Sequence, residues 1–307
     1  MRIIKDTQID FMSQSRFAAF ISGALILAGI ISLGINKGPN LSIDFKGGSM
    51  VAVNYTEPVD INEVRSALSN VSIDGQNFDF SQVEIKHFGD KSNVVVRLPT
   101  LEDEPEQFLQ KFVSNMKNIF PALIPENEND FILSIEKVGP KIGAELSGKA
   151  VMAILSALAL ILVYISIRFE FKYAVGAIVA LTHDVVVTLG IFSILGYEVS
   201  LAVIAAFLTI VGYSLNDTIV IFDRIRENVK SLKRVTMSQV VNQSINESLS
   251  RTIVTSLTTF FVVFILYLYG GEVIHHFAFA MIIGVLVGTY SSVFVASPIV
   301  VRMESES

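Results

Sequence analysis

Apolar residues along this chain are gathered into six long windows separated by polar segments. Each window is long enough to cross the hydrocarbon core of a bilayer, which takes about 20 apolar residues in a helix. Any other backbone conformation would leave peptide groups unpaired in lipid, so each window is expected to be helical. The six predicted spans are residues 17–35, 150–167, 173–195, 201–222, 253–269 and 277–301.

Basic residues are distributed unevenly among the segments that connect these spans. Lys and Arg precede the first span and also occur between the second and third, between the fourth and fifth, and after the sixth. The loops 196–200 and 270–276 contain none. Because short basic segments stay on the cytoplasmic side, both termini are predicted to be cytoplasmic. The first span resembles a signal sequence, but its long apolar run and the lack of a small-residue exit site predict that it is retained.

The segment 36–149, between the first two spans, has the character of a small soluble domain. Residues 36–137 include nine Lys or Arg and sixteen Asp or Glu. Strand-like stretches occur at 49–55, 82–88, 93–98 and 131–138, and helical spacing follows Asp60 and Pro105. The order βαββαβ is that of a ferredoxin-like α+β domain. With the termini inside, this domain is predicted to lie in the periplasm.

The predicted organisation thus has three parts. Residues 1–35 form a cytoplasmic N-terminus and the first span, 36–149 form the periplasmic α+β domain, and 150–307 form five further spans. Within the last part, residues 223–251 are polar and are predicted to be a cytoplasmic loop. Loosely spaced apolar residues in that loop predict a short helix lying on the membrane or on the bundle.

Composition narrows the range of functions further. Of 307 residues, 51% are apolar and only 17% are charged, whereas soluble proteins have about a quarter charged. The net charge of −6 weighs against a nucleic-acid partner, and the absence of cysteine excludes disulfides, thiolate metal sites and a Cys nucleophile. His275 and His276 have no third ligand nearby, and no phosphate-binding loop occurs. Neither a metal nor another cofactor is therefore expected.

Ionisable residues inside a span cost about 2.5 to 3.5 kcal/mol on insertion scales and therefore indicate function. Asp217 lies about 7 to 8 Å inside the predicted end of the fourth span, with Tyr213 one turn away and Asn216 beside it. Arg251 opens the fifth span, and Thr255 follows on the same face. Because neighbouring spans run antiparallel, Arg251 is expected to reach Asp217 and form a switchable ion pair suited to proton transport. The alternative is a solvated helix end.

Two further groups of residues within the spans lead to hypotheses. His183 and Asp184 lie near the predicted midplane of the third span, where they either take part in a proton relay or bond to their neighbours and fix helix packing. Gly284, Gly288 and Ser292 belong to a ridge of small residues spaced four apart in the sixth span. Such a ridge predicts close packing against another helix.

Several motifs together resemble the SecD/SecF family of protein-export membrane proteins, which is related to the resistance-nodulation-division transporters. The resemblance covers almost the whole chain and includes the arrangement of the spans. The motifs are Asp44-Phe-Lys-Gly47-Gly48 after the first span, residues 138–146 with Gly139 and Pro140, residues 212–218 and 222–227, residues 251–259, and residues 288–298.

The resemblance implies a non-enzymatic accessory subunit of the Sec machinery in the bacterial inner membrane. Such a subunit works with SecD and the SecYEG channel, and possible further partners are other Sec accessory subunits, the translocating preprotein and membrane lipid. The resemblance also implies that the proton motive force, or sodium in some relatives, promotes late steps of export. In the family, the residues at the positions of Asp217 and Arg251 are implicated in proton passage, whereas His183 and Asp184 acquire no role from it.

Two other functions fit parts of the pattern. An efflux half-transporter of the same superfamily, for a lipid or a small molecule, would need a large outer domain, whereas this one has only about a hundred residues. An intramembrane aspartyl protease would need Asp184 and Asp217 to share a proton around a water molecule, and the flanking signatures of such proteases are missing.

Overall fold

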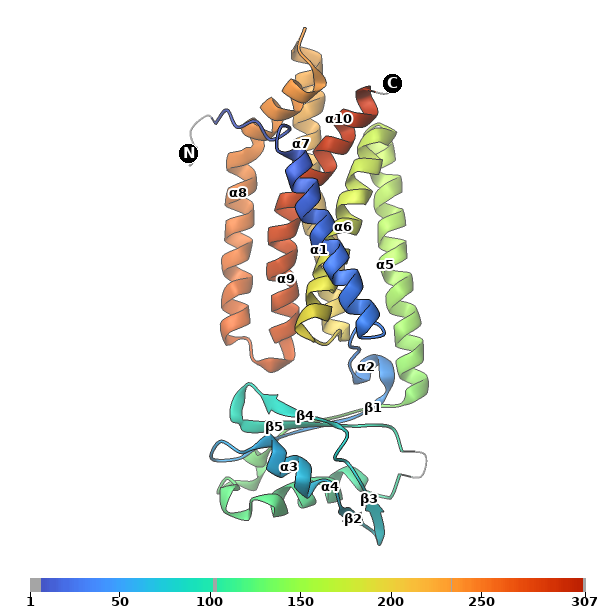
Figure 1. The fold of residues 1–307 in the computed structure, drawn as a ribbon, viewed down its shortest axis with the longest axis vertical. Helices are drawn as coiled ribbons and strands as arrows, with labels where there is room; N and C mark the ends of the chain where they lie inside the picture. Colours follow the sequence, from blue (N-terminus) through green and yellow to red (C-terminus); the bar gives the residue numbers. More distant parts are fainter. Residues whose placement is uncertain (1–6, 102–103, 233, 306–307) are drawn as a thin grey trace. The chain divides into compact units, whose positions relative to one another are not determined.

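The computed structural model describes residues 7–101, 104–232 and 234–305, and Figure 1 shows its helices and strands. The chain forms two compact units. One is Leu41–Lys149, called here the α+β unit, and the other, the membrane unit, combines Met1–Asn40 with Ala150–Ser307. Each unit has its own core and is described by itself.

Six helices of the described chain are long and apolar enough to cross a membrane, which confirms the six predicted spans. They differ in burial. In their most apolar windows, 44–50% of residues are buried in α6, α7 and the sixth span, against 6–17% in α1, α5 and α8. The spans are α1 (Ser15–Ile35), α5 (Pro140–Arg168), α6 (Phe171–Leu195), α7 (Leu201–Ser231), α8 (Met237–Tyr269), and α9 (Glu272–Ser291) continued by η3 (Ser292–Ala296) and α10 (Ser297–Ser305).

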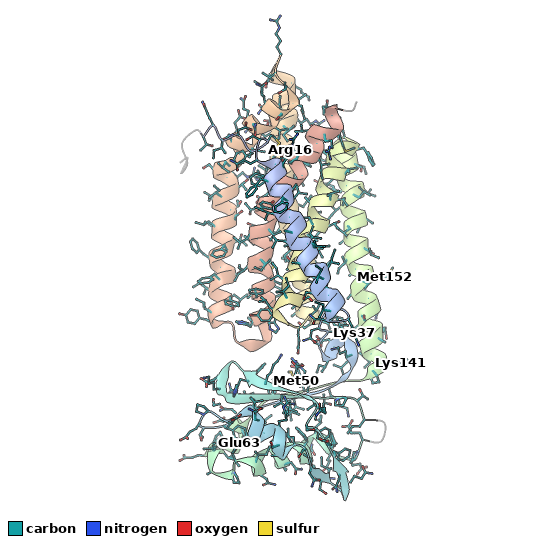
Figure 2. The ribbon with its side chains drawn as sticks, viewed as in Figure 1. Arg16, Lys37, Met50, Glu63, Lys141 and Met152 are labelled. Atoms are coloured by element: carbon teal, nitrogen blue, oxygen red, sulfur yellow. The ribbon has the colours of Figure 1, made fainter. Side chains whose placement is uncertain are left out.

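Three helices therefore form the centre of the bundle, and the other three present apolar side chains outward. Met152 on α5, for example, is 64% exposed (Figure 2). Exposed apolar surface of this kind faces lipid or another membrane protein.

The polar segment 223–251 corrects a prediction, because it is two helical extensions rather than a loop with a separate short helix. α7 continues well past its apolar part, and α8 begins at a capping box on Thr236. Asn228 donates hydrogen bonds to Ser244 Oγ (3.0 Å) and Glu247 Oε2 (2.9 Å), so the extensions pack together. Polar composition shows where a helix leaves the lipid, whereas capping residues decide where it ends.

The sixth span contains one π-helical turn, η3. Pro298 follows it and has no N–H group to donate, so the regular hydrogen bonding is interrupted there. Ser297 Oγ donates to the carbonyl O of Ser292 (2.8 Å) and satisfies one carbonyl group. The turn carries Phe294 and Val295, which line a pocket on the membrane unit.

The α+β unit is built on an antiparallel sheet with the order β4-β5-β1-β6. Its main elements are β1 (Gly48–Asn54), α3 (Ile61–Ala67), β4 (Glu84–Phe88), β5 (Asp90–Leu98), α4 (Phe108–Ile119) and β6 (Ile132–Val138). This is the ferredoxin-like βαββαβ arrangement, as predicted. The unit also contains a hairpin of β2 (Val71–Ile73) and β3 (Gln76–Phe78), which was not predicted. Its turn, Asp74-Gly75, has positive φ at both residues and is a typical hairpin signal in a sequence.

Strand β1 is the centre of this unit and is buried on both faces. Val51 lies opposite Val96 of β5 and Ile135 of β6. The face with Val51 packs in one core with α3 and α4, whereas Ala52, on the other face, packs with Ile43 of the short helix α2 (Ile43–Lys46). The helix that precedes β1 therefore belongs to the second core of the unit.

Candidate functional site

Asp217 of α7 is buried, with 2% of its surface exposed. Its Oδ2 accepts a 3.3 Å hydrogen bond from Ser256 Oγ of α8. Ser256 Oγ is also 2.6 Å from Thr289 Oγ1 of α9, so polar side chains connect the three helices. Among the described residues, Thr255 of α8 also approaches this carboxylate as a side-chain donor, and the bond from Ser256 is long.

Two hydroxyl groups near this carboxylate are buried and have no hydrogen-bond partner in the described part of the chain. They are Tyr213 OH, one turn from Asp217 on α7, and Thr252 Oγ1, one turn from Ser256 on α8. A buried polar group that lacks a hydrogen bond costs about 1–3 kcal/mol and calls for an explanation. This arrangement can take up a proton on Asp217, or it can offer carboxylate and hydroxyl oxygens to a small hard cation.

The other residues predicted around Asp217 are more exposed than Asp217 itself. Arg251 and Asn216 are exposed, and in the described chain Arg251 forms no ion pair with Asp217. Thr255 Oγ1 donates to the carbonyl O of Arg251 on its own helix (3.1 Å). The expected ion pair is therefore not formed in this structure. Instead Ser256, one position further around α8, bonds to Asp217.

Asp184 of α6 is fully buried and well supplied with hydrogen bonds. Its Oδ2 accepts from Ser214 Oγ of α7 (2.6 Å) and from Ser291 Oγ of α9 (2.8 Å). Its Oδ1 is 2.9 Å from Nδ1 of His183, whose Nε2 is 2.9 Å from Ser22 Oγ of α1. The network ties α1, α7 and α9 to α6.

Ser22 also links this network to α9. Tyr290 OH donates to the carbonyl O of Ala18 (2.7 Å), and Tyr290 OH lies 3.0 Å from Ser22 Oγ. Each side-chain polar atom of His183 and Asp184 therefore has a hydrogen-bond partner, which lowers the cost of burying the pair.

The two buried aspartates belong to separate networks. Asp184 is bonded to Ser214 and Ser291, whereas Asp217 is bonded to Ser256, and no partner is shared among the described residues. An aspartyl protease needs two carboxylates that share one proton. The structure therefore does not assemble the active site that this alternative requires.

The small-residue ridge of α9 packs directly against α7. A Cβ added at Gly284 would lie 2.2 Å from the side chain of Ile210, and one at Gly288 would lie 2.9 Å from the Cβ of Ser214. Ser292, the next member of the ridge, is fully buried in η3. The ridge therefore sets the distance between α9 and the helix that carries Ser214 to the buried Asp184 network.

The motif glycines of the α+β unit lie at a junction. Gly47 and Gly48 have φ angles of 74° and 120°, a region that favours glycine. A Cβ at Gly47 would lie 2.8 Å from Cα of Pro140, and one at Gly48 would lie 2.5 Å from the carbonyl O of Leu98. The segment that enters the unit thus packs against Gly139 and Pro140, where the chain leaves it.

Helix α2 continues this contact. The N–H of Asp44 donates to Ser42 Oγ (3.2 Å), and Ser42 Oγ donates to Asp44 Oδ2 (3.0 Å), which caps the helix. A Cβ at Gly143 of α5 would lie 2.8 Å from the carbonyl O of Phe45. The segments by which the chain enters and leaves the α+β unit are therefore packed against each other within that unit.

Sequence analysis missed most residues that complete these networks. They are Ser22, Ser214, Thr252, Ser256, Thr289, Tyr290 and Ser291. It also missed a close contact between α1 and α6, where a Cβ at Gly29 would lie 2.7 Å from Cα of Gly190. One signal was available in α8, where buried hydroxyl residues recur every four positions: Ser244, Ser248, Thr252 and Ser256.

No group of His, Cys, Asp and Glu side chains in the described residues is arranged to hold a metal ion. The ring of His275 lies 4.1 Å from that of Tyr267, and the ring of His276 lies 4.7 Å from that of Tyr197. The two histidines therefore pack against different aromatic rings.

Comparison with known proteins identifies relatives of the whole chain. Residues 122–306 match the family described as protein export membrane protein SecD/SecF, C-terminal, and residues 33–59 match the SecD/SecF GG motif. Protein translocase subunit SecF of Calditerrivibrio nitroreducens is 44% identical over 99% of this chain and 97% of its own length. Protein translocase subunit SecF of Escherichia coli O157:H7 is 39% identical over 96% of this chain and 87% of its own length.

Two solved structures share the fold. SecDF, a translocon-associated membrane protein from Thermus thermophilus, aligns with a TM-score of 0.81 and 38% identity over 98% of this chain. SecDF in a super-membrane-facing form aligns with a TM-score of 0.67 and 37% identity over 99% of this chain. This chain spans only 39% and 40% of those two longer chains.

Proposed function

The chain belongs to the SecD/SecF family of protein export membrane proteins, and we propose that it is an accessory subunit of the Sec translocase that uses an ion gradient to promote late steps of protein export. Its matched relatives are translocase subunits rather than enzymes, and it is not an enzyme either. The proposed location is the bacterial cytoplasmic membrane, with both termini in the cytoplasm and the α+β unit in the periplasm.

The observation that carries the proposal is the incomplete hydrogen bonding of Asp217. A carboxylate held at 3.3 Å by Ser256, with no short hydrogen bond among the described residues, can change its protonation or its partner without breaking a complete network. Arg251, at the start of the fifth predicted span, is the proposed partner of the charged form in another state. One charge that crosses 100 mV yields about 2.3 kcal/mol, so repeated cycles are needed to move a chain.

The proposed coupling ion is a proton, with sodium as the alternative. Asp217 can hold a proton, and the hydroxyl groups of Tyr213, Thr252 and Ser256 can help to pass it. The same oxygens are hard ligands of the kind that a sodium ion prefers. Transport driven by either gradient alone distinguishes the two ions.

SecD is the proposed partner in the membrane, SecYEG the channel, and a translocating preprotein the substrate. The matched SecDF chains extend far beyond this one, which supports a partner of SecD type. The outer helices α5 and α8 have only 6% and 11% of their apolar windows buried, so they offer surface for such a partner. Other Sec accessory subunits are further candidates.

Completion of preprotein translocation tests the proposal. Proteoliposomes that contain SecYEG, SecD and this chain are compared with and without a proton gradient, and again with a sodium gradient. Omission of this chain should remove the response to the gradient. An unchanged response without it would contradict the coupling role, and failure to co-purify with SecD after mild detergent extraction would contradict the partnership.

The proposed orientation is tested separately. Because the chain has no cysteine, Asn77→Cys introduces a single thiol in the α+β unit. An impermeant thiol reagent should label it from the periplasmic side. Labelling from the cytoplasmic side alone would overturn the proposed topology.

A further inference from the structure

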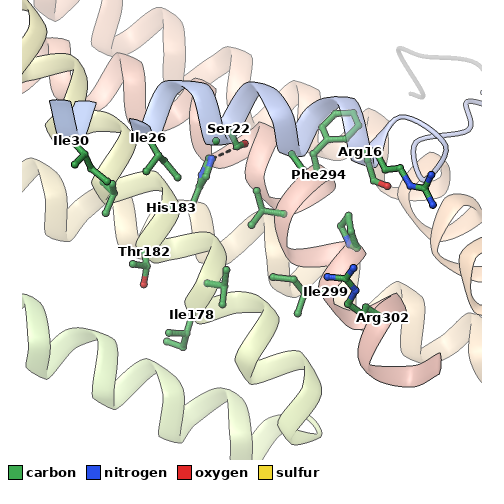
Figure 3. A pocket seen from close by; sticks show the side chains of 17 residues that line it. Arg16, Ser22, Ile26, Ile30, Ile178, Thr182, His183, Phe294, Ile299 and Arg302 are labelled. Atoms are coloured by element: carbon green, nitrogen blue, oxygen red, sulfur yellow. Dashed lines mark hydrogen bonds between the residues drawn. The ribbon is translucent and has the colours of Figure 1, made fainter. Parts of the chain in front are cut away.

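A pocket of about 900 Å³ lies on the membrane unit between α1, α6 and the sixth span (Figure 3). Most of its lining is apolar, including Ile26 and Ile30 of α1 and Ile178 of α6. Ser22 and His183 also line it, but their polar atoms are bonded to each other at 2.9 Å. Along most of its length the pocket therefore suits an apolar ligand.

Positive charge is confined to one end of this pocket. Arg16 at the start of α1 and Arg302 of α10 line that end, away from Ile26 and Ile30 (Figure 3). None of the described residues in its lining is Asp or Glu. The pocket thus combines a cationic end with an apolar length.

The dimensions of the pocket match one leaflet of a membrane. From Arg16 to Ile30 an α-helix rises about 21 Å, and half of a bilayer with its head groups measures about 20–22 Å. Arg16 is the second residue of a membrane span, which places the cationic end near the level of the lipid head groups. The apolar end then reaches the middle of the bilayer.

We propose that this pocket binds one anionic phospholipid, with its phosphate on Arg16 and Arg302 and an acyl chain along Ile26 and Ile30. Basic pockets between spans bind anionic head groups, and the guanidinium fork matches the oxygens of a phosphate. This inference does not depend on the proposed coupling to an ion gradient.

A helix of a partner protein is the main alternative occupant, and it fits less well. A helix would match the positive end of the pocket only where it carried an acidic side chain, whereas the phosphate of a lipid meets both arginines with a complementary charge.

Tryptophan fluorescence provides a direct test, because the chain has no tryptophan. Ile26→Trp puts a fluorophore in the pocket, and Leu27→Trp puts one at nearly the same depth on α1 but outside the pocket lining. The full chain is reconstituted in mixtures of brominated phosphatidylglycerol and brominated phosphatidylcholine with the same acyl chains. Quenching as a function of the mixture gives the relative affinity for the two lipids at each position.

We expect phosphatidylglycerol to be preferred at Ile26→Trp by about fivefold for each arginine, which corresponds to about 1 kcal/mol each. At Leu27→Trp the two lipids should quench equally. Combining Ile26→Trp with Arg16→Gln and Arg302→Gln should remove the preference, whereas Arg16→Lys with Arg302→Lys should keep most of it. Millimolar inorganic phosphate should not displace the lipid.

Several results would overturn the proposal. They are equal quenching by both lipids at Ile26→Trp, a preference that survives loss of both arginines, or displacement by free phosphate, which would indicate an anion site only. Native mass spectrometry of the complex with SecD provides the second measurement. Retained phosphatidylglycerol that is lost in the double Gln variant supports the proposal, and its absence from the wild-type complex shows that a partner helix covers the pocket.

Discussion

Asp184 and Asp217 are both buried in the helix bundle, but their surroundings differ in the number of hydrogen bonds. Asp184 accepts from Ser214 and Ser291 and is paired with His183. Asp217 has no short hydrogen bond, and the Tyr213 and Thr252 hydroxyls on the same two helices have no partner among the described residues. Asp184 is 0% and Asp217 is 2% exposed, so burial does not explain the difference.

This difference in hydrogen bonding leads us to expect a packing role for Asp184 and a transport role for Asp217. A complete network around His183 and Asp184 stabilises one arrangement of helices, because any movement of α1, α7 or α9 breaks a hydrogen bond. An incomplete network leaves alternative partners within reach, which an ion carrier needs. We therefore expect substitutions at the two sites to fail in different assays.

The largest expected effect is on transport at Asp217. Asp217→Asn keeps the size of the side chain but cannot take up or release a proton. It should fold and bind SecD normally, since removal of a buried charge spares its desolvation, yet lose the gradient-dependent part of translocation. The assay is preprotein translocation in proteoliposomes at matched protein levels.

The control for this variant is Asp217→Glu, which still titrates and should keep part of the response. If Asp217→Asn responds to the gradient as the wild type does, Asp217 is not the carrier. The two aspartates would then differ only in how they contribute to helix packing.

The next effect is on stability at Asp184. Asp184→Leu leaves the donors of Ser214, Ser291 and His183 without an acceptor and should cost about 3–5 kcal/mol. Asp184→Asn can accept from both serines and donate to Nδ1 of His183, so it should cost much less. Thermal unfolding of the full chain in detergent measures both.

Translocation per folded molecule should change little in the Asp184 variants. A lost gradient response with normal thermal stability would instead make Asp184 part of the relay. Equal destabilisation by Leu and Asn would contradict the expectation that Asn can replace Asp184 in this network.

A smaller effect is expected where the ridge of α9 meets α7. Gly288→Leu would force side-chain atoms into Ser214, whose Cβ lies 2.9 Å from the position of an added Cβ. Overpacking of this kind costs about 1–3 kcal/mol, and here it should also disturb the Asp184 network. Gly212→Leu is the matched control, because nothing lies within 4 Å of a Cβ added there. Equal melting temperatures for the two variants would contradict the close contact.

The smallest effect concerns the unpartnered hydroxyl of Thr252. Thr252→Val preserves the shape and removes a buried polar atom without a partner, so it should leave stability unchanged or raise it by about 1 kcal/mol. The same exchange at Thr188, whose Oγ1 donates to the carbonyl O of Asp184 (2.7 Å), should lower stability slightly. Melting curves of the two variants should therefore shift in opposite directions, and parallel shifts would show that Thr252 is satisfied.

The sequence identified both aspartates and favoured Asp217 as the carrier, but it did not show which partners surround each of them. Their identities and depths follow from the position of each residue in an apolar window, which requires no knowledge of neighbouring helices. The partners of each are on other helices, and hydroxyl residues are common enough in spans that their presence alone indicates little. The expected Arg251 pair failed for the same reason, since the rotation of α8 about its axis turns Ser256, five residues further along, toward Asp217.

The sequence by itself determined the number of spans, the position of the α+β unit and its βαββαβ order, because these depend on local periodicity and on the cost of leaving peptide groups unpaired in lipid. It also indicated that the residues around Gly47 and Gly48 are special, although not what they contact. Only the tertiary structure decided which polar groups meet: the saturated network of Asp184, the open one of Asp217, and the pocket between Arg16 and Ile30. Such contacts depend on how each helix is rotated about its axis, and that rotation is set by packing across the whole bundle.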